Sequence, residues 1–337
     1  MRGASRLAIS IGISPLVVGL TVVAFGTSLP ELAVSVQSAW SGKVDIALGN
    51  VVGSNIFNVL FILGISALIT PLVVNQQVIR QDVLVMIGAS LLLWAVAADG
   101  GISRWEGLIF VALLLGYLFL LVRQSRRKST AIRAQYADSM PGVGVAWERH
   151  WGAQVLLILV GLTLLILGSN WLVEAAVTLA RQLGMSELVV GLTIVAAGTS
   201  LPEVATSVMA AIRGERDIAV GNVVGSNIFN ILAVLGISAS IAPSDLSVAA
   251  SMLAFDLPVM LAVAVACLPI FFTGSLITRW EGALFFAYYL AYTGYLILLN
   301  GGDDALQPFN AIMGNFVLPL TFVALAVLAL RHWHTTR

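Results

Sequence analysis

Two glutamates interrupt long apolar segments of this 337-residue sequence at equivalent points. Glu31 lies in "GTSLPEL", inside an apolar run from Leu16 to Val36, and Glu203 lies in "GTSLPEV" in a second such run. An ionised side chain at the centre of a bilayer costs about 3 kcal/mol or more and usually has a function. No lysine or arginine of the apolar segments is placed to neutralise either carboxylate. We therefore predict that both glutamates hold cations.

Oxygen-bearing residues accompany Glu31 at helical spacing. Thr27, Glu31 and Ser35 follow one another at i, i+4 and i+8, so they share one face of a helix. Pro30 has no N–H and crowds the carbonyl four residues before it, which predicts a break in that helix. The break releases backbone carbonyls near Gly26 and Thr27. Broken helix at membrane depth is tolerated where it is buried or lines a wet cavity.

A second polar stripe follows in the next apolar segment, within "GNVVGSNIFN". Asn50, Ser54 and Asn58 share one helix face by the same spacing. Carboxylate, hydroxyl, amide and carbonyl oxygens suit hard cations such as calcium, and the neutral oxygens also suit sodium. The second copy repeats these groups with Thr199, Ser200, Pro202, Glu203, Ser207, Asn222, Ser226 and Asn230.

The remaining polar residues of the repeated segments have more ordinary interpretations. Asp45 and Asp217 each open a predicted helix, where aspartate commonly serves as the N-cap. Asn55 and Asn227 fall off the polar stripe and are interpreted as hinge or packing residues. Four further acidic residues lie near predicted span ends and are expected at the membrane interface, with Asp256 the one that could lie deeper: Asp82, Glu106, Asp256 and Glu281.

Composition requires an integral membrane protein, because 59% of the residues are hydrophobic, 10% are charged and the mean hydropathy is +0.99. A spanning helix needs about 20 apolar residues, and runs of that length are too long for barrel strands. The single cysteine, Cys267, excludes an intramolecular disulfide and is expected to be a buried apolar residue. Ten spans are predicted, at 14–40, 44–70, 81–98, 105–123, 152–180, 185–212, 217–242, 248–272, 280–299 and 308–330.

Positive charge predicts the orientation of these spans. With a cytoplasmic N-terminus, 14 of the 17 lysines and arginines lie inside, and only Lys43, Arg104 and Arg181 lie outside. Both termini are therefore predicted to be cytoplasmic, in a multi-pass protein of the cell (inner) membrane. The long polar stretch at 124–150 is predicted to be a basic cytoplasmic linker. Its charge is explained by topology, and the net charge of zero gives no indication of a nucleic-acid partner.

An internal repeat divides the sequence into two halves. Residues 13–64 align without gaps on 185–236, and 36 of the 52 positions are identical. The chain crosses the membrane five times between equivalent points, an odd number, so the two copies must be inverted. Inverted repeats are typical of secondary transporters, whose substrate site lies near the bilayer midplane. We predict an all-α polytopic fold of two inverted repeats with about five helices each.

The duplicated "GTSLPE…GNVVGSNIFN" resembles the α-repeats of the cation/calcium antiporter superfamily, most closely the prokaryotic sodium/calcium exchangers. The resemblance covers nearly the whole chain and implies the sodium/calcium exchanger fold. It implies calcium coordination by Glu31 and Glu203, with the carbonyls of Thr27 and Thr199. It also implies that sodium sites are completed by Ser28, Ser54, Asn58, Ser200, Ser226 and Asn230.

Two departures from that family pattern affect the expectations. Some prokaryotic members carry aspartate where this sequence has Asn230, so the site here has two carboxylates, and the coupling ion and stoichiometry stay open. The first repeat (1–123) lacks about twenty residues that match the start of the second (151–299). We expect either a misplaced start codon or the loss of the family's first helix, with an additional helix at 308–330 outside the repeats.

The sequence thus predicts a secondary antiporter, with calcium and sodium as transported ions, the lipid bilayer as surroundings and no cofactor. Exchange by alternating access at the two-glutamate site is the main hypothesis. Calcium/proton exchange is the closest alternative, because glutamates can also carry protons. A cation channel is disfavoured by the inverted duplication. An enzyme is not expected, since all three histidines lie in predicted polar segments. The oligomeric state is not predicted.

Overall fold

The computed structural model describes residues 15–127, 184–272 and 274–301, with isolated positions between 152 and 178 and residues 313–314. The described chain is almost entirely helical, as predicted. The predicted spans at 152–180 and 308–330 lie outside the continuous described ranges, as does most of the predicted linker at 124–150.

The two halves contain matching series of helices, in which η marks a π-helical segment except for η4, a 3-10 turn. The first half contains α2 (Pro15–Val18), η1 (Gly19–Val23), α3 (Ala24–Thr27), α4 (Leu29–Trp40), α5 (Val44–Phe57), η2 (Asn58–Leu63), α6 (Gly64–Ile69), η3 (Val78–Asp82), α7 (Val83–Val96), η4 (Ala97–Asp99) and α8 (Arg104–Arg127). The second contains α11 (Glu187–Val190), η6 (Gly191–Val195), α12 (Ala196–Thr199), α13 (Leu201–Ile212), α14 (Arg216–Phe229), η7 (Asn230–Leu235), α15 (Gly236–Ile241), η8 (Met252–Asp256), α16 (Leu257–Phe272) and α17 (Arg279–Gly301).

Within the described residues, eight segments are long and apolar enough to cross a membrane. Two of them are bent pairs, Leu16–Thr27 with Leu29–Trp40 and Glu187–Thr199 with Leu201–Ile212. The other six are continuous: Val44–Ile69, Val78–Asp99, Arg104–Gln124, Arg216–Ile241, Met252–Phe272 and Arg279–Leu299. These eight segments correspond to eight of the ten predicted spans.

The bends lie where the prolines predicted helix breaks. The first bent pair turns by 43° and the second by 46°. Ser28 and Ser200 leave the helical conformation there, with ψ near 6° and 8°. Pro30 and Pro202 are the second residues of the helices that follow, where a missing N–H costs nothing to the new helix.

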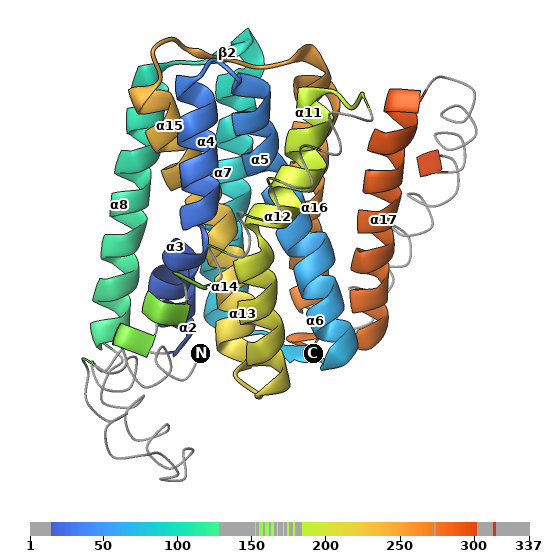
Figure 1. Ribbon diagram of the computed structural model, residues 1–337. Coiled ribbons are helices and arrows are strands. Elements are labelled where there is room, and N and C mark those ends of the chain that lie inside the picture. Colours follow the sequence, from blue (N-terminus) through green and yellow to red (C-terminus); the bar gives the residue numbers. More distant parts are fainter. Residues whose placement is uncertain are drawn as a thin grey trace.

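The equivalent bent spans run in opposite directions. Figure 1 shows α2 and α13 towards one end of the bundle and α4 and α11 towards the other. The first bent span therefore ascends in this view while the second descends. The inverted repeat that was predicted from the odd number of crossings is seen directly in the helix directions.

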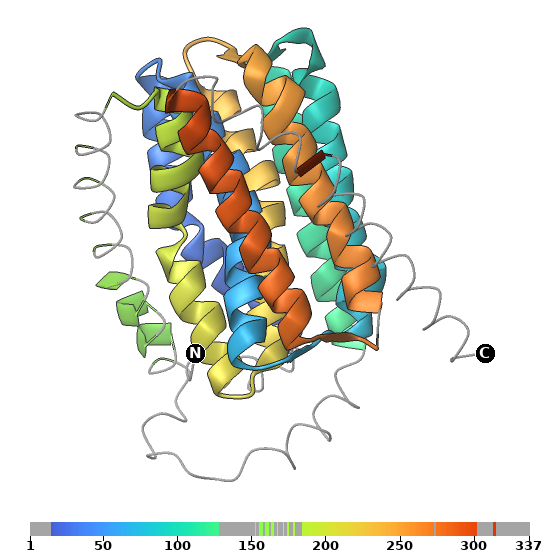
Figure 2. The ribbon, with the colours of Figure 1, turned by 90° about the vertical axis from the view of Figure 1, so that its right-hand side faces the viewer.

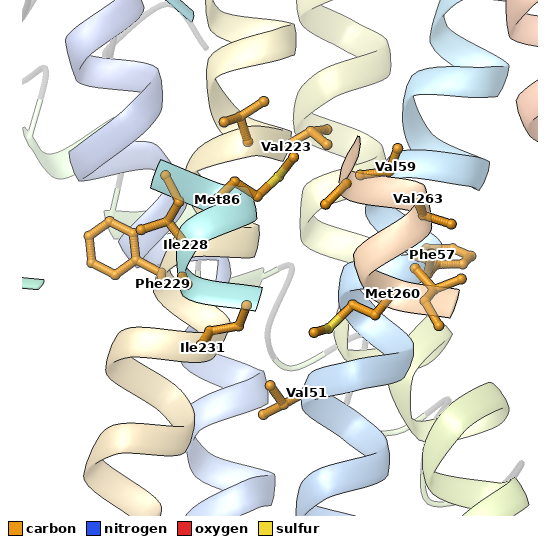
Figure 3. Close-up of a cluster of buried hydrophobic side chains, with 14 of the residues drawn as sticks. Val51, Phe57, Val59, Met86, Val223, Ile228, Phe229, Ile231, Met260 and Val263 are labelled. Carbon is orange, nitrogen blue, oxygen red and sulfur yellow. The ribbon is translucent and has the colours of Figure 1, made fainter. Parts of the chain in front are cut away.

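Two continuous spans form the centre of the bundle. In Val44–Ile69, 78% of the apolar window is buried inside the protein, and in Arg216–Ile241 the share is 100%. The four outer spans bury between 22% and 39%, so they carry the surface suited to lipid. Figure 2 shows one of these, α17, lying across the outside of the bundle. Apolar residues from the central helices and from α7 and α16 pack together (Figure 3).

Short antiparallel strand pairs join the two halves. β1 (Leu72–Val73) pairs with β4 (Leu276–Ile277), and β2 (Gly101–Ile102) pairs with β3 (Leu246–Ser247). In each pair one strand comes from each half. Arginines add matching links, since Arg104 Nη2 donates to the carbonyl of Ala242 at 3.2 Å and Arg279 Nη2 to that of Ile69 at 3.4 Å. The halves are therefore tied together by backbone and side chain.

The prediction that Asp45 and Asp217 are N-caps is wrong. Lys43 and Glu215 occupy the N-cap positions of α5 and α14, and the two aspartates lie within the first turn. Each helix begins earlier than the aspartate, so the carboxylate follows the cap. The charge is still favourably placed, because the first turn of a helix attracts negative charge.

Glu106 and Glu281 lie at the beginning of their spans, in agreement with the sequence. Each accepts two hydrogen bonds from the residue three positions earlier. The backbone N and Oγ of Ser103 both lie 2.7 Å from Glu106 Oε2, and Thr278 donates to Glu281 Oε2 in the same way. This is a capping box, which satisfies helix N–H groups that otherwise lack partners.

Candidate ion-binding site

Glu31 and Glu203 lie in the first turn of α4 and α13, directly after the two helix breaks. The side chains of both are fully buried. A helix N-terminus carries partial positive charge and unpaired N–H groups, so it favours a carboxylate. The breaks therefore place two carboxylates inside the bundle, each at a helix end that stabilises negative charge.

Each carboxylate accepts a hydrogen bond from a serine of the opposite half, and Glu203 also accepts one from Ser226 of its own half. Ser200 Oγ donates to Glu31 Oε1 at 2.8 Å. Glu203 Oε1 accepts from Ser28 Oγ at 3.3 Å and from Ser226 Oγ at 3.2 Å. Since Ser28 and Ser200 are the break residues themselves, each break supplies a hydroxyl to the glutamate of the other. The two carboxylates thus belong to one site shared between the halves.

The threonines of the motif make a second set of crossed contacts. Thr199 Oγ1 donates to Asn50 Oδ1 at 2.9 Å, and Thr27 Oγ1 donates to Asn222 Oδ1 at 3.2 Å. Asn50 Nδ2 in turn donates to the backbone oxygen of Glu31 at 3.2 Å. The polar stripe predicted on the second span of each half therefore faces the helix break of both halves.

Four oxygens of this region are buried and lack a hydrogen-bond partner among the described residues. They are Glu31 Oε2, Glu203 Oε2, Asn58 Oδ1 and Asn230 Oδ1. A buried oxygen without a donor is costly, whereas carboxylate and amide oxygens are ligands of hard cations. No cluster of three or more histidine, cysteine, aspartate or glutamate side chains forms in the described ranges. The donor set is therefore two carboxylates with neutral oxygens, which fits calcium or sodium as substrate.

Positive side chains are kept away from the two glutamates. In the described spans, lysine and arginine lie within a few residues of a span end, the most internal being Arg80 and Arg123. Both glutamates lie next to the midpoint of a bent span. Their charge must therefore be balanced by a bound ion or a proton, because an unbalanced charge at this depth is unfavourable.

All ten residues predicted for the site lie in described segments and are at most 3% exposed. Direct contacts join several of them across the halves, as given above. Ser54 differs from its counterpart Ser226, because its hydroxyl donates to the backbone oxygen of Ala196 at 3.3 Å. The ten are Thr27, Ser28, Glu31, Ser54, Asn58, Thr199, Ser200, Glu203, Ser226 and Asn230. Their binding of ions stays a prediction.

Asn55 and Asn227 make contacts that the sequence did not predict. Asn58 Nδ2 donates to Asn227 Oδ1 at 3.0 Å, and Asn230 Nδ2 donates to Asn55 Oδ1 at 3.1 Å. Asn55 Nδ2 also donates to the backbone oxygen of Asn227 at 3.3 Å, and the reverse bond is 3.2 Å. Asparagine occurs at this position in both copies, which indicated a role, but nothing in the sequence identified the hydrogen-bond partners.

Asp82 and Asp256 are buried between helices, so the expectation that Asp82 lies at the interface is wrong. They are 0% and 3% exposed. Tyr117 Oη donates to Asp82 Oδ1 at 3.0 Å, and Tyr292 Oη donates to Asp256 Oδ1 at 2.9 Å. In the structure both aspartates lie one turn inside their spans, which begin at Val78 and Met252. The covering tyrosine comes from the following span, which the sequence did not indicate.

The motif, the fold and the crossed carboxylates agree with the comparison to known families. A family model described as sodium/calcium exchanger protein matches residues 1–123 and 153–298. This match covers most of the sequence. The chain belongs to the sodium/calcium exchanger family. The resemblance inferred from the α-repeats is thereby confirmed, and the family is one of ion transporters, not enzymes.

Individual relatives and a solved structure support this membership. The putative antiporter CaxA of Alkalimonas amylolytica is 41% identical over 302 residues, which is 88% of this chain and 92% of CaxA. The inner membrane protein YrbG of Escherichia coli (strain K12) is 42% identical over 72% of this chain and 74% of its own. The solved sodium-calcium exchanger NCX_Mj, soaked with sodium and calcium, superposes with a TM-score of 0.68 at 30% identity, covering 86% of this chain and 89% of NCX_Mj.

Proposed function

We propose that this exchanger moves calcium against sodium at one central site that opens alternately to the two sides of the cytoplasmic membrane. The observation that carries the proposal is the pair of buried glutamates, Glu31 and Glu203, each held by a serine of the other half. Their second oxygens lack partners among the described residues. A divalent cation between them would balance the two charges and use those oxygens.

The neighbouring oxygens divide into two proposed groups. Calcium is bound by both glutamate carboxylates and by the backbone carbonyls of Thr27 and Thr199, which the breaks leave near the site. Sodium ions use the surrounding neutral oxygens with the same carboxylates. This second group consists of Ser28, Ser54, Asn58, Ser200, Ser226 and Asn230. Calcium and sodium then compete for shared ligands.

Competition at a shared site gives exchange. An empty pair of buried carboxylates is unfavourable at membrane depth, so the protein changes its opening only with ions bound. Two inverted halves provide two similar packings, one open to each side. The bends at Ser28 and Ser200, where the backbone leaves the helical conformation, are the proposed hinges of this change.

The proposed cellular setting is supported by the charge distribution and by one relative. YrbG is named an inner membrane protein, and the distribution of lysine and arginine supports a cytoplasmic location for both ends of this chain. We propose calcium extrusion driven by sodium entry. Calcium/proton exchange is the second candidate, because a proton on each glutamate would balance the same charges.

Calcium-45 uptake into proteoliposomes tests these proposals. Purified protein is reconstituted with an outward sodium gradient or, separately, an outward proton gradient. Uptake that follows the sodium gradient and is lost in Glu31→Gln and Glu203→Gln would support the proposal. The matched control is Glu187→Gln, which changes an exposed glutamate at the start of α11 and should retain uptake.

Other results separate the alternatives. Uptake driven only by the proton gradient would favour calcium/proton exchange. Single-channel currents in planar bilayers would favour a channel, since an alternating-access carrier gives none. Uptake that persists in both glutamine variants would refute the two-glutamate site, whichever ion drives it.

A further inference from the structure

Four asparagines form a closed arrangement where the central helices of the two halves meet. Asn55 and Asn58 come from the first half, and Asn227 and Asn230 from the second. Each pair donates to the other pair, with distances of 3.0–3.3 Å given above. All four are at most 2% exposed. Water therefore cannot readily replace a hydrogen bond that one of them loses.

The amide of Asn227 is fixed at both of its ends. Its Nδ2 donates to the backbone oxygen of Asn55 and lies 3.5 Å from Met86 Sδ, a weak acceptor. Its Oδ1 accepts from Asn58 Nδ2. Rotating this amide by half a turn would bring oxygen against the oxygen of Asn55 and nitrogen against the nitrogen of Asn58. The opposite orientation is therefore disfavoured at two contacts.

Asn55 is fixed in the equivalent way, with Met260 in place of Met86. Asn55 Nδ2 donates to the backbone oxygen of Asn227 and lies 3.6 Å from Met260 Sδ. Its Oδ1 accepts from Asn230 Nδ2. Figure 3 shows Met86 on α7 and Met260 on α16, with their thioethers in the space between these helices. The orientation of each asparagine is thus determined by groups from the opposite half.

This arrangement determines which atom Asn58 and Asn230 present. Their amide nitrogens are held by Asn227 and Asn55, while their Oδ1 atoms have no partner among the described residues. An asparagine amide has one accepting end and one donating end. Only the oxygen can bind a cation, and an exposed NH₂ group would repel it.

We infer that Asn55 and Asn227 are positioning residues, each of which turns the amide oxygen of the other half's ligand asparagine towards the cation. The inference rests on the proposed function, because it assumes that Asn58 and Asn230 bind the transported ion. Asn55 and Asn227 need not touch the ion themselves. Their effect is on ion affinity, through an orientation.

Crossed rescue tests the inference. Asn227→Ala removes the acceptor that holds Asn58, so the Asn58 amide can rotate, and losing that one bond predicts about a tenfold rise in the KM for calcium. Adding Asn58→Asp should remove most of that rise, because a carboxylate presents oxygen in either orientation. Adding Asn230→Asp instead should leave the rise in KM unchanged, since Asn230 is held by Asn55 and not by Asn227.

The rise in KM that Asn227→Ala causes is measured relative to the protein that carries the same aspartate substitution alone. The effect of the added charge on KM then cancels. KM and Vmax come from calcium-45 uptake at a series of calcium concentrations. An equivalent set of variants tests the other half: Asn55→Ala, to which Asn230→Asp should restore a low KM and Asn58→Asp should not. This set decides the result if Asn227→Ala is not monodisperse. Asn75→Ala, in an exposed loop, is the matched control and should change KM by less than about twofold, below the worth of one hydrogen bond.

Two results would overturn the inference. One is a fall in Vmax with unchanged KM, which indicates a packing or conformational role. The other is equal rescue by both aspartates, which indicates added charge and not orientation. Wild-type protein that takes up no calcium under either gradient would instead refute the proposed function, and it would do so before any asparagine is changed.

Discussion

Gly53→Ala is expected to destabilise the protein, because Gly53 lies where α5 crosses η6 and α12. A β-carbon there would lie 2.4 Å from the backbone oxygen of Leu192 and 2.8 Å from Cβ of Ala196. Ordinary contact begins at 3.4 Å, so the helices must separate by about 1 Å at this crossing. Neither neighbour is the end of a flexible side chain that could move aside.

The magnitude follows from two opposing effects. Overpacking a well-packed core costs about 1–3 kcal/mol, and a clash with backbone belongs at the upper end. Replacing glycine by alanine inside a helix returns about 0.5–1 kcal/mol. The net loss is therefore about 2 kcal/mol, which corresponds to a Tm lower by about 4–8 °C for a protein of a few hundred residues.

Thermal unfolding of purified protein in detergent measures this change. Gly88→Ala is the matched control, because Gly88 lies inside α7 and an added β-carbon there meets no atom within 4 Å. Its Tm should stay the same or rise. Equal Tm values for the two variants would refute the reasoning that close backbone approach is what requires glycine at position 53.

Three further predictions concern single contacts. Ser200→Ala removes a charge-assisted hydrogen bond of 2.8 Å to Glu31, so the KM for calcium should rise at least about tenfold in the uptake assay; an unchanged KM would contradict the role of the crossed serine. Tyr117→Phe leaves the buried Asp82 without its donor and should cost about 1–3 kcal/mol, seen as a lower Tm that Asp82→Asn largely relieves. Cys267 is fully buried, so maleimide should label it only after denaturation, and fast labelling of native protein would contradict the packing of α16.

Local features of the fold followed from the sequence because their causes are local. Proline without an N–H at Pro30 and Pro202 predicted the two bends, and apolar runs predicted the spans. The odd number of crossings between the copies predicted the inversion without any structural information. The positions of Glu31 and Glu203 inside the membrane followed from the same runs.

Contacts between the halves could not be predicted, because a helix face is visible in the sequence while its partner is not. The bond from Ser200 to Glu31 joins residues 169 positions apart. The two-residue strands are too short to give a pattern of alternation. Asp82 shows the same limit, since the sequence placed it near a span end and did not identify the covering Tyr117. The N-cap prediction for Asp45 failed because helix ends are uncertain by one or two residues.

The hydroxyls of Ser54 and Ser226 break the near-twofold symmetry of the molecule. Ser226 binds the carboxylate of Glu203, whereas Ser54 binds a backbone oxygen, that of Ala196. A symmetric molecule cannot be open on one side only, so under the proposed alternating access each one-sided conformation must be asymmetric and the two halves must exchange roles between the two conformations. In the opposite-facing conformation we expect Ser54 to bind Glu31 and Ser226 to bind the backbone oxygen of Ala24. The hydrogen-bond partners of these two serines would then indicate which side of the membrane the site is open to.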